Sequence, residues 1–124
     1  MITICNKTYK IANFKNGFNK SPYYDNPRNG TSIILEIENG YITYKRKNTE
    51  MSISIDLINK IYNYIISNNL LGEKLYTKHI IDIKNKVFPD YTGWHNCDGT
   101  FIMMIFRFVL EKSIHDKCPC YIII

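Results

Sequence analysis

The sequence lacks the motifs that mark several common enzyme classes. Its six glycines are scattered and form no phosphate-binding loop, and its eleven acidic residues are dispersed, with no carboxylate pair suited to nuclease or hydrolase metal chemistry. Glutamine is absent and Ala12 is the only alanine, whereas isoleucine, asparagine, lysine and tyrosine are abundant. This bias is typical of an AT-rich coding genome, so part of the lysine excess reflects codon usage.

The chain also lacks a targeting segment and a long hydrophobic run. Residues 1–7 do not contain the continuous apolar stretch of a signal peptide. The longest apolar run, residues 101–110, has about half the length that a bilayer crossing needs, and Arg107 interrupts it. We therefore expect a cytoplasmic protein with no membrane partner and no cofactor. In a reducing compartment its cysteines are expected to be free thiols: Cys5, Cys97, Cys118 and Cys120.

The first half of the chain is expected to be antiparallel sheet. The length of 124 residues suits one compact domain, residues 1–124. Residues 2–5 and 8–14 are β-prone runs separated by a tight turn, and residues 15–30 form a long loop. The pair Asn39-Gly40 predicts a type I′ turn that places Leu35 opposite Tyr44. Alternating residues would then share the core face: Ile33, Leu35, Ile37, Ile42 and Tyr44. Residues 51–55 add a third strand.

The second half is expected to be helical. Apolar residues at helical spacing predict helices from Asp56 to before Gly72, from Thr77 to before Pro89, and from Asp98 or Thr100 to about Ser113. The third of these is apolar all round and must be buried. Residues 118–124 suit a short terminal strand. The prediction is an α+β fold in which N-terminal antiparallel hairpins or a β-meander pack against three C-terminal helices.

Cys97 is the candidate for a catalytic residue. The segment Asn96-Cys97-Asp98-Gly99-Thr100-Phe101 resembles the nucleophile segment of papain-like and NlpC/P60 peptidases, which also place the cysteine at the start of the central helix. The resemblance implies a thiolate favoured by the positive end of the helix. Its general base would be His79 or His95. The alternative is a buried, unreactive cysteine next to a helix cap at Asp98.

A zinc-stabilised interaction domain is a further alternative. The residues His95, Cys97, Cys118 and Cys120 offer four ligands of a zinc-compatible kind. Their spacing matches no recognised zinc knuckle, and the competing interpretation places Cys118 and Cys120 on a terminal strand.

Arg107 is a charged residue inside an apolar run, so it must reach the surface or meet a partner. We expect it on the outer face of its helix, paired with Glu111 one turn later. The alternative is that it lines a pocket for an acidic ligand.

A basic, aromatic surface is the candidate binding site. The formal net charge is +5, and cations and rings are interleaved in residues 15–30 and at the end of the second hairpin strand. Such a mixture suits the binding of single-stranded nucleic acid or of a protein partner. A lysine-rich rim that is merely exposed to solvent would have the same sequence pattern. The candidate interface residues are Lys15, Lys20, Tyr23, Tyr24, Arg28, Lys45, Arg46 and Lys47.

These observations favour a non-enzymatic protein that binds nucleic acid or a nucleic-acid-handling complex. Small size, AT-rich composition and the missing catalytic set suggest an accessory protein of a phage or other mobile element, for example an inhibitor of a host defence complex. The terminal strand could also pair with a second copy and form a homodimer. The cysteine-nucleophile enzyme and the zinc-stabilised domain are the alternatives.

Overall fold

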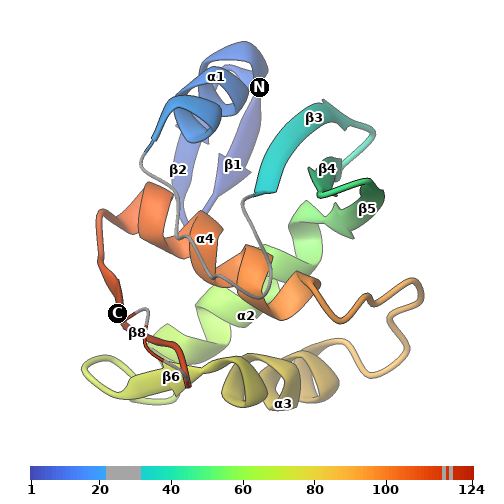
Figure 1. The fold of residues 1–124 in the computed structure, drawn as a ribbon. Coiled ribbons are helices and arrows are strands. Elements are labelled where there is room, and N and C mark those ends of the chain that lie inside the picture. The colour runs from blue at the N-terminus through green and yellow to red at the C-terminus, as the bar shows by residue number, and fades with distance from the viewer. Residues whose placement is uncertain (22–31, 116, 118) are drawn as a thin grey trace.

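The computed structural model describes residues 1–21, 32–115, 117 and 119–124, and it confirms the α+β class (Figure 1). The elements in chain order are β1 (Ile2–Ile4), β2 (Lys7–Tyr9), α1 (Ile11–Lys20), β3 (Ser32–Glu38), β4 (Tyr41–Arg46), β5 (Thr49–Ser54), α2 (Ile55–Ser67), β6 (Lys74–Tyr76), α3 (Thr77–Val87), α4 (Asp98–Leu110), β7 (Ile114–His115) and β8 (Tyr121–Ile123).

Helix α4 is the centre of the molecule. In Figure 1 it crosses the middle of the ribbon, with β1, β2 and α1 on one side and α3 on the other. Nine of its thirteen residues are buried, as expected for a helix that is apolar all round. It ends at Leu110, earlier than predicted, because Glu111 takes a left-handed conformation with φ 55°. No helix among residues 1–21, 32–115, 117 and 119–124 combines the length and the hydropathy needed to cross a bilayer.

The predicted meander is present as β3-β4-β5. Asn39 and Gly40 both have positive φ angles, 53° and 80°, which a type I′ turn requires. Near the turn the predicted pairing is confirmed, but Ile34, and not Leu35, pairs with Tyr44. A β-bulge at this point adds one residue to β3 and exchanges the two faces of the strand beyond it. The expected core positions of Ile33 and Leu35 are therefore wrong, and Ile34 is buried instead.

Helix α1 replaces part of the expected strand and loop. The β-prone run at 8–14 is a strand only as far as Tyr9, and residues 11–20 of the segment that follows are helical. Phe14 and Phe18 lie one turn apart, are fully buried and contact the ring of Phe108, with centroid distances of 5.5 and 5.8 Å. Tertiary packing against α4 therefore determines this helix. The predicted loop residues 22–30 lie outside the described part of the chain.

The C-terminal half follows the predicted order. Helix α2 begins after Ser54, whose hydroxyl accepts a hydrogen bond from the backbone of Leu57 at 3.3 Å, and α3 begins at Thr77 as expected. The expected terminal strand is β8, which lies between β6 and β7 in a second three-stranded sheet. That sheet was not foreseen, because β6 and β7 are too short to give a pattern of their own.

Helices α3 and α4 come into close contact at Gly99. A Cβ atom at this position would lie 2.8 Å from Cγ2 of Thr77, well inside the separation at which carbon atoms pack. Gly99→Ala should therefore lower the free energy of unfolding by about 1–2 kcal/mol. At a helix position without this contact, the same change would instead stabilise the helix by up to about 1 kcal/mol. Urea unfolding measures the change. Thr77→Ser removes Cγ2, so the loss should largely disappear in that background; an equal loss in both backgrounds would contradict the contact.

Candidate functional site

Three rings form a continuous row across the C-terminal sheet. Tyr76 of β6 is paired with Tyr121 of β8, which is in turn paired with His115 of β7. Side chains at paired positions of neighbouring strands lie on the same face. The Tyr76 and Tyr121 ring centroids are 5.4 Å apart, and His115 stacks on Tyr121 at 4.5 Å with an interplanar angle of 18°. We call Tyr76, Tyr121 and His115 the ring row.

The ring row lies on the outer face of a sheet whose inner face is buried. Leu75 and Ile122, the residues that alternate with the rings, are 3% and 0% exposed. Tyr76 and Tyr121 are half-buried, and His115 is exposed. This is the alternation of a strand with one face in the core and one in water. Strand pairing and the buried inner face therefore hold the rings in place.

Basic and polar groups surround the ring row. Lys74, two residues before Tyr76 on β6, holds its Nζ atom 5.0 Å from the centroid of the Tyr121 ring. The ring of His79, in the first turn of α3, lies 5.5 Å from that of Tyr76. His79 Nδ1 also accepts a hydrogen bond from the backbone of Tyr76 at 3.1 Å. A neutral His79 therefore carries its proton on Nε2, which is left to donate to another group.

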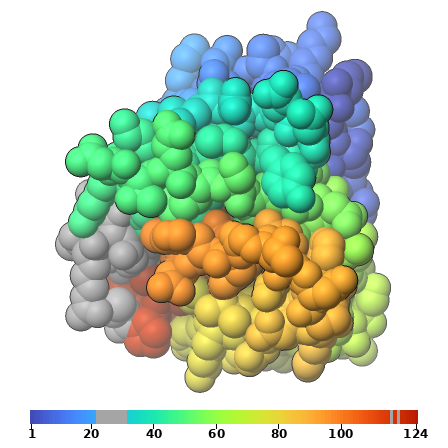
Figure 2. Space-filling view, turned by 90° about the vertical axis from the view of Figure 1, so that its right-hand side faces the viewer, coloured from blue at the N-terminus to red at the C-terminus, as the bar shows by residue number. Residues whose placement is uncertain are grey.

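A second group of rings and lysines has a structural role. Residues 88–97 join α3 to α4 and lie between the meander and α3 in the space-filling view (Figure 2, orange). Tyr91 accepts a hydrogen bond from the backbone of Ser54 at 3.1 Å, which fastens this segment to β5. Lys84 is only 8% exposed, with Nζ 5.4 Å from the centroid of the Trp94 ring and 3.1 Å from Asn85 Oδ1. Such a covered ammonium is not available to a large ligand.

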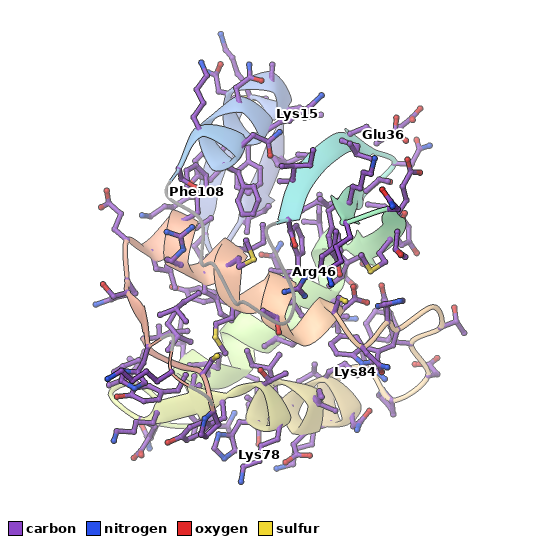
Figure 3. All side chains as sticks on the ribbon, viewed as in Figure 1. Lys15, Glu36, Arg46, Lys78, Lys84 and Phe108 are labelled. Carbon is purple, nitrogen blue, oxygen red and sulfur yellow. The ribbon has the colours of Figure 1, made fainter. Side chains whose placement is uncertain are left out.

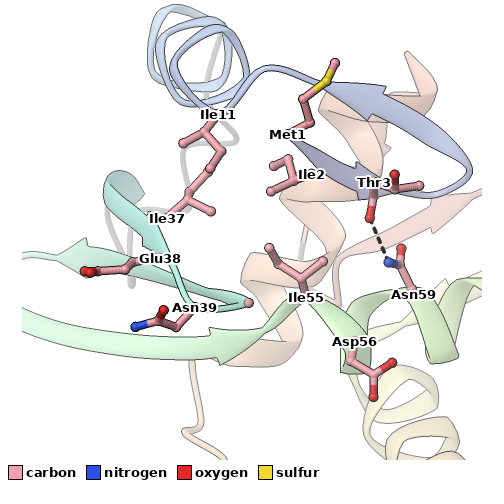
Figure 4. A pocket seen from close by; sticks show the side chains of 11 residues that line it. Met1, Ile2, Thr3, Ile11, Ile37, Glu38, Asn39, Ile55, Asp56 and Asn59 are labelled. Carbon is pink, nitrogen blue, oxygen red and sulfur yellow. Dashed lines mark hydrogen bonds between the residues drawn. The ribbon is translucent and has the colours of Figure 1, made fainter.

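A cavity of about 480 Å³ lies near the N-terminal hairpin (Figure 4). Ile11, Ile37 and Ile55 contribute apolar surface to it, Glu38 and Asp56 contribute two carboxylates, and Met1 carries the N-terminal ammonium. Carboxylates that outnumber the cations in a cavity lining disfavour phosphate groups. This part of the molecule is therefore a poor candidate for nucleic-acid binding.

The predicted interface residues that the structure describes lie on α1 and around the end of β4. Lys15 and Lys20 are on α1, whereas Lys45 and Lys47 belong to β4 and the turn after it. Figure 3 places Lys15 at the top of the molecule and Arg46 near its middle.

Arg46 is 5% exposed and lies opposite Ser32 in the sheet, so its expected place on the surface is wrong. The remaining three candidates, Tyr23, Tyr24 and Arg28, lie outside the described residues.

Cys97 immediately precedes α4 and is half-buried. His95 Nδ1 accepts a hydrogen bond from the backbone nitrogen of Cys97 at 3.1 Å, and His79 Nδ1 is bonded to Tyr76. Within the described ranges, neither imidazole is hydrogen-bonded to the sulfur of Cys97. The geometry thus gives no support to the resemblance with cysteine peptidases.

The expected helix cap at Asp98 is instead a buried link between β4 and α4. Its Oδ1 accepts a hydrogen bond from the Tyr44 hydroxyl at 2.5 Å, and its Oδ2 accepts one from the backbone of His95 at 2.9 Å. Burial raises the pKa of the Asp98 carboxyl, and these two hydrogen bonds oppose the rise. Burial and the adjacent Asp98 raise the pKa of Tyr44, which stays protonated.

The predicted zinc ligands do not assemble in the described part of the chain. Among residues 1–21, 32–115, 117 and 119–124, no three His, Cys, Asp or Glu side chains are grouped closely enough to hold a metal ion. Cys118 lies outside these residues, whereas His95 is exposed and Cys97 and Cys120 are half-buried.

Arg107 does not form the expected pair with Glu111. Its Nε and Nη2 atoms are buried and have no hydrogen-bond partner among the described residues, and burial lowers the pKa of the guanidinium. Glu111 is exposed at the end of α4.

Comparison with protein-family models, curated proteins and solved structures finds no match to this chain. A function can therefore be inferred only from the structure itself, here from the ring row and the side chains around it. Sequence reasoning missed this row because its members are far apart in the chain. The one local signal is the alternation of outward and buried residues in Lys74-Leu75-Tyr76 and again in Tyr121-Ile122-Ile123.

Proposed function

We propose that the protein is a non-enzymatic binding protein that engages single-stranded nucleic acid through the ring row. The observation that supports this proposal is the in-register line of Tyr76, Tyr121 and His115 with the Lys74 ammonium over its central ring. Unpaired bases stack on aromatic side chains, and nearby lysines neutralise the phosphates that link them. A sheet that carries aromatic residues on its outer face is a common platform for single strands.

The distribution of charge fits the same partner. Lys78, at the start of α3 and at the bottom of Figure 3, and Lys117, in the segment before β8, are both exposed. Together with Lys74 they place cations on the three segments that carry or adjoin the rings. A typical protein-binding patch is instead depleted of lysine at its core. The ring row therefore favours nucleic acid over a protein partner.

The narrower expectations stay predictions. They are an origin in a phage or mobile element, inhibition of a host defence complex, a cytoplasmic location and a homodimer. The expected dimer contact through the terminal strand is wrong, because β8 is already paired with β6 on one side and with β7 on the other. The nucleic-acid proposal is compatible with each of these predictions and depends on none.

Fluorescence anisotropy with a labelled short oligothymidylate tests the proposal. Tyr121→Ala should weaken binding about 5- to 150-fold, because it removes the central ring, on which His115 stacks and over which Lys74 lies, and the loss of one base stacked on a ring is worth about 1–3 kcal/mol. Tyr121→Phe keeps the ring and should bind nearly as well as the wild type. Lys74→Ala should reduce the slope of log affinity against log salt by about 0.7, the value for one phosphate contact on a single strand.

Two variants serve as controls. Tyr41→Ala removes an exposed tyrosine from the sheet β3-β4-β5, and it should leave affinity unchanged. Replacing Lys45 and Lys47 with serine tests the strand end that the sequence favoured, and under this proposal it has only a small, general charge effect. Absence of binding at low salt, or a Tyr121→Ala variant with wild-type affinity, would refute the proposal.

A further inference from the structure

A cavity of about 310 Å³ opens beside the ring row, between the end of α2, β6 and α3. Leu70, Leu75 and Ile83 supply its apolar surface. Leu75 and Ile83 are buried core residues, 3% and 4% exposed. The cavity is at the small end of the range for small-molecule sites. It has room for one flat heterocycle, and apolar side chains to pack against the faces of that ring.

The charged side chains of this cavity cancel one another. Lys74 and Lys86 line it together with Glu73 and Asp82, and all four are exposed. A free phosphate or other small anion would meet two carboxylates here as well as two ammonium groups. The cavity therefore favours an uncharged ligand whose edge both donates and accepts hydrogen bonds.

The cavity is continuous with the ring row. Lys74 lines the cavity and also lies over the Tyr121 ring, and His79 lines it while its own ring contacts that of Tyr76. A strand stacked along the row thus passes the mouth of the cavity. An unstacked base of that strand could enter it while its neighbours remain on the rings.

From this geometry we infer that the cavity binds one unstacked nucleobase of the strand held by the ring row, an inference that rests on the proposed function. The carboxylates of Glu73 and Asp82 accept hydrogen bonds from an exocyclic amino group, which adenine, cytosine and guanine carry and thymine lacks. Lys86, one helical turn after Asp82 on α3, has its Nζ atom 3.4 Å from the Tyr64 hydroxyl and donates a hydrogen bond to it. The site discriminates in favour of amino-bearing bases.

The experiment compares an oligothymidylate with the same strand carrying one adenine, cytosine or guanine. The protein can shift its register along a homopolymer, so the single base can reach the cavity. Each substituted strand should bind the wild type about five- to tenfold more tightly than the parent. In the variant Glu73→Ala with Asp82→Ala this preference should vanish, although the parent strand binds at least as well. Glu36→Ala with Glu38→Ala removes the same charge from exposed positions on β3 and should keep the preference.

The possible failures are distinguishable. If the parent strand binds and the wild type shows no preference, or if the preference survives in the Glu73 and Asp82 variant, the inference is wrong while the proposed function stands. Survival would mean that stronger stacking on the rings explains the preference. If no strand binds at all, both the inference and the proposed function are wrong.

Discussion

Tyr44→Phe is expected to lower the free energy of unfolding by about 1.5–3 kcal/mol at neutral pH, the range for a hydrogen bond to a charged group. The Tyr44 hydroxyl and the Asp98 carboxylate are joined inside the core, and both residues are fully buried. Phenylalanine keeps the ring that stacks on Phe101 at a centroid distance of 3.7 Å. The loss therefore reports the hydrogen bond and not the packing. Equilibrium unfolding in urea measures it.

The size of this loss should depend on pH. Burial already raises the pKa of Asp98, and without the Tyr44 hydroxyl the pKa of this carboxyl should rise further. A carboxyl whose pKa in the folded protein exceeds its unfolded value, about 4, favours the folded state at low pH and loses that contribution as pH rises. The loss in Tyr44→Phe should thus grow from about 1 kcal/mol near pH 4, where a neutral hydrogen bond is removed, to its full size near pH 7.

Tyr41→Phe is the matched control, because Tyr41 is on the same strand and 49% exposed. Its unfolding curve should coincide with that of the wild type at both pH values. A loss in Tyr44→Phe that is the same at low and neutral pH would show that Asp98 carries no buried charge in the folded protein.

The elements that could be predicted from the sequence are those with local signals. The Asn39-Gly40 turn, the meander around it and the three C-terminal helices follow from residue types at short spacing. Helix α1 has no such local signal. Phe14 and Phe18 are buried on one face of it because both pack against Phe108, which is remote in the chain. The bulge at Leu35 likewise reverses the two faces of β3 beyond it, and no residue type within the strand indicates it.

The candidate site was harder to predict than the fold. A search for cations next to rings in the sequence leads to residues 15–30 and to Lys45-Arg46-Lys47, where the residues are neighbours in the chain. The ring row is assembled from three short strands, and strand pairing alone makes Tyr76, Tyr121 and His115 neighbours. Burial, too, depends on tertiary structure: Arg46 is enclosed although its neighbour Lys47 is exposed.

Arg107→Met is expected to raise the free energy of unfolding by about 1–3 kcal/mol, the scale of a buried polar group left without a partner. Two guanidinium nitrogens of Arg107 are buried without a hydrogen-bond partner within the described ranges, and Arg107 is the one charged residue in the apolar run 101–110 of α4. Methionine has a similar length, fills irregular space and brings no unsatisfied donor. Urea unfolding of the variant measures the gain.

Glu111→Gln separates this account from the pairing that the sequence suggests. If Arg107 and Glu111 formed an ion pair one helical turn apart, the glutamine variant would lose about 0.3–0.5 kcal/mol, and Arg107→Met would lose a similar amount. In the structure Glu111 is exposed and takes a left-handed backbone conformation at the end of α4. Its replacement should therefore have no measurable effect on the free energy of unfolding. A destabilised Arg107→Met variant would mean that the guanidinium has a partner in solution. Because the group is only partly enclosed, an anion added to the buffer would then protect the wild type and not the variant.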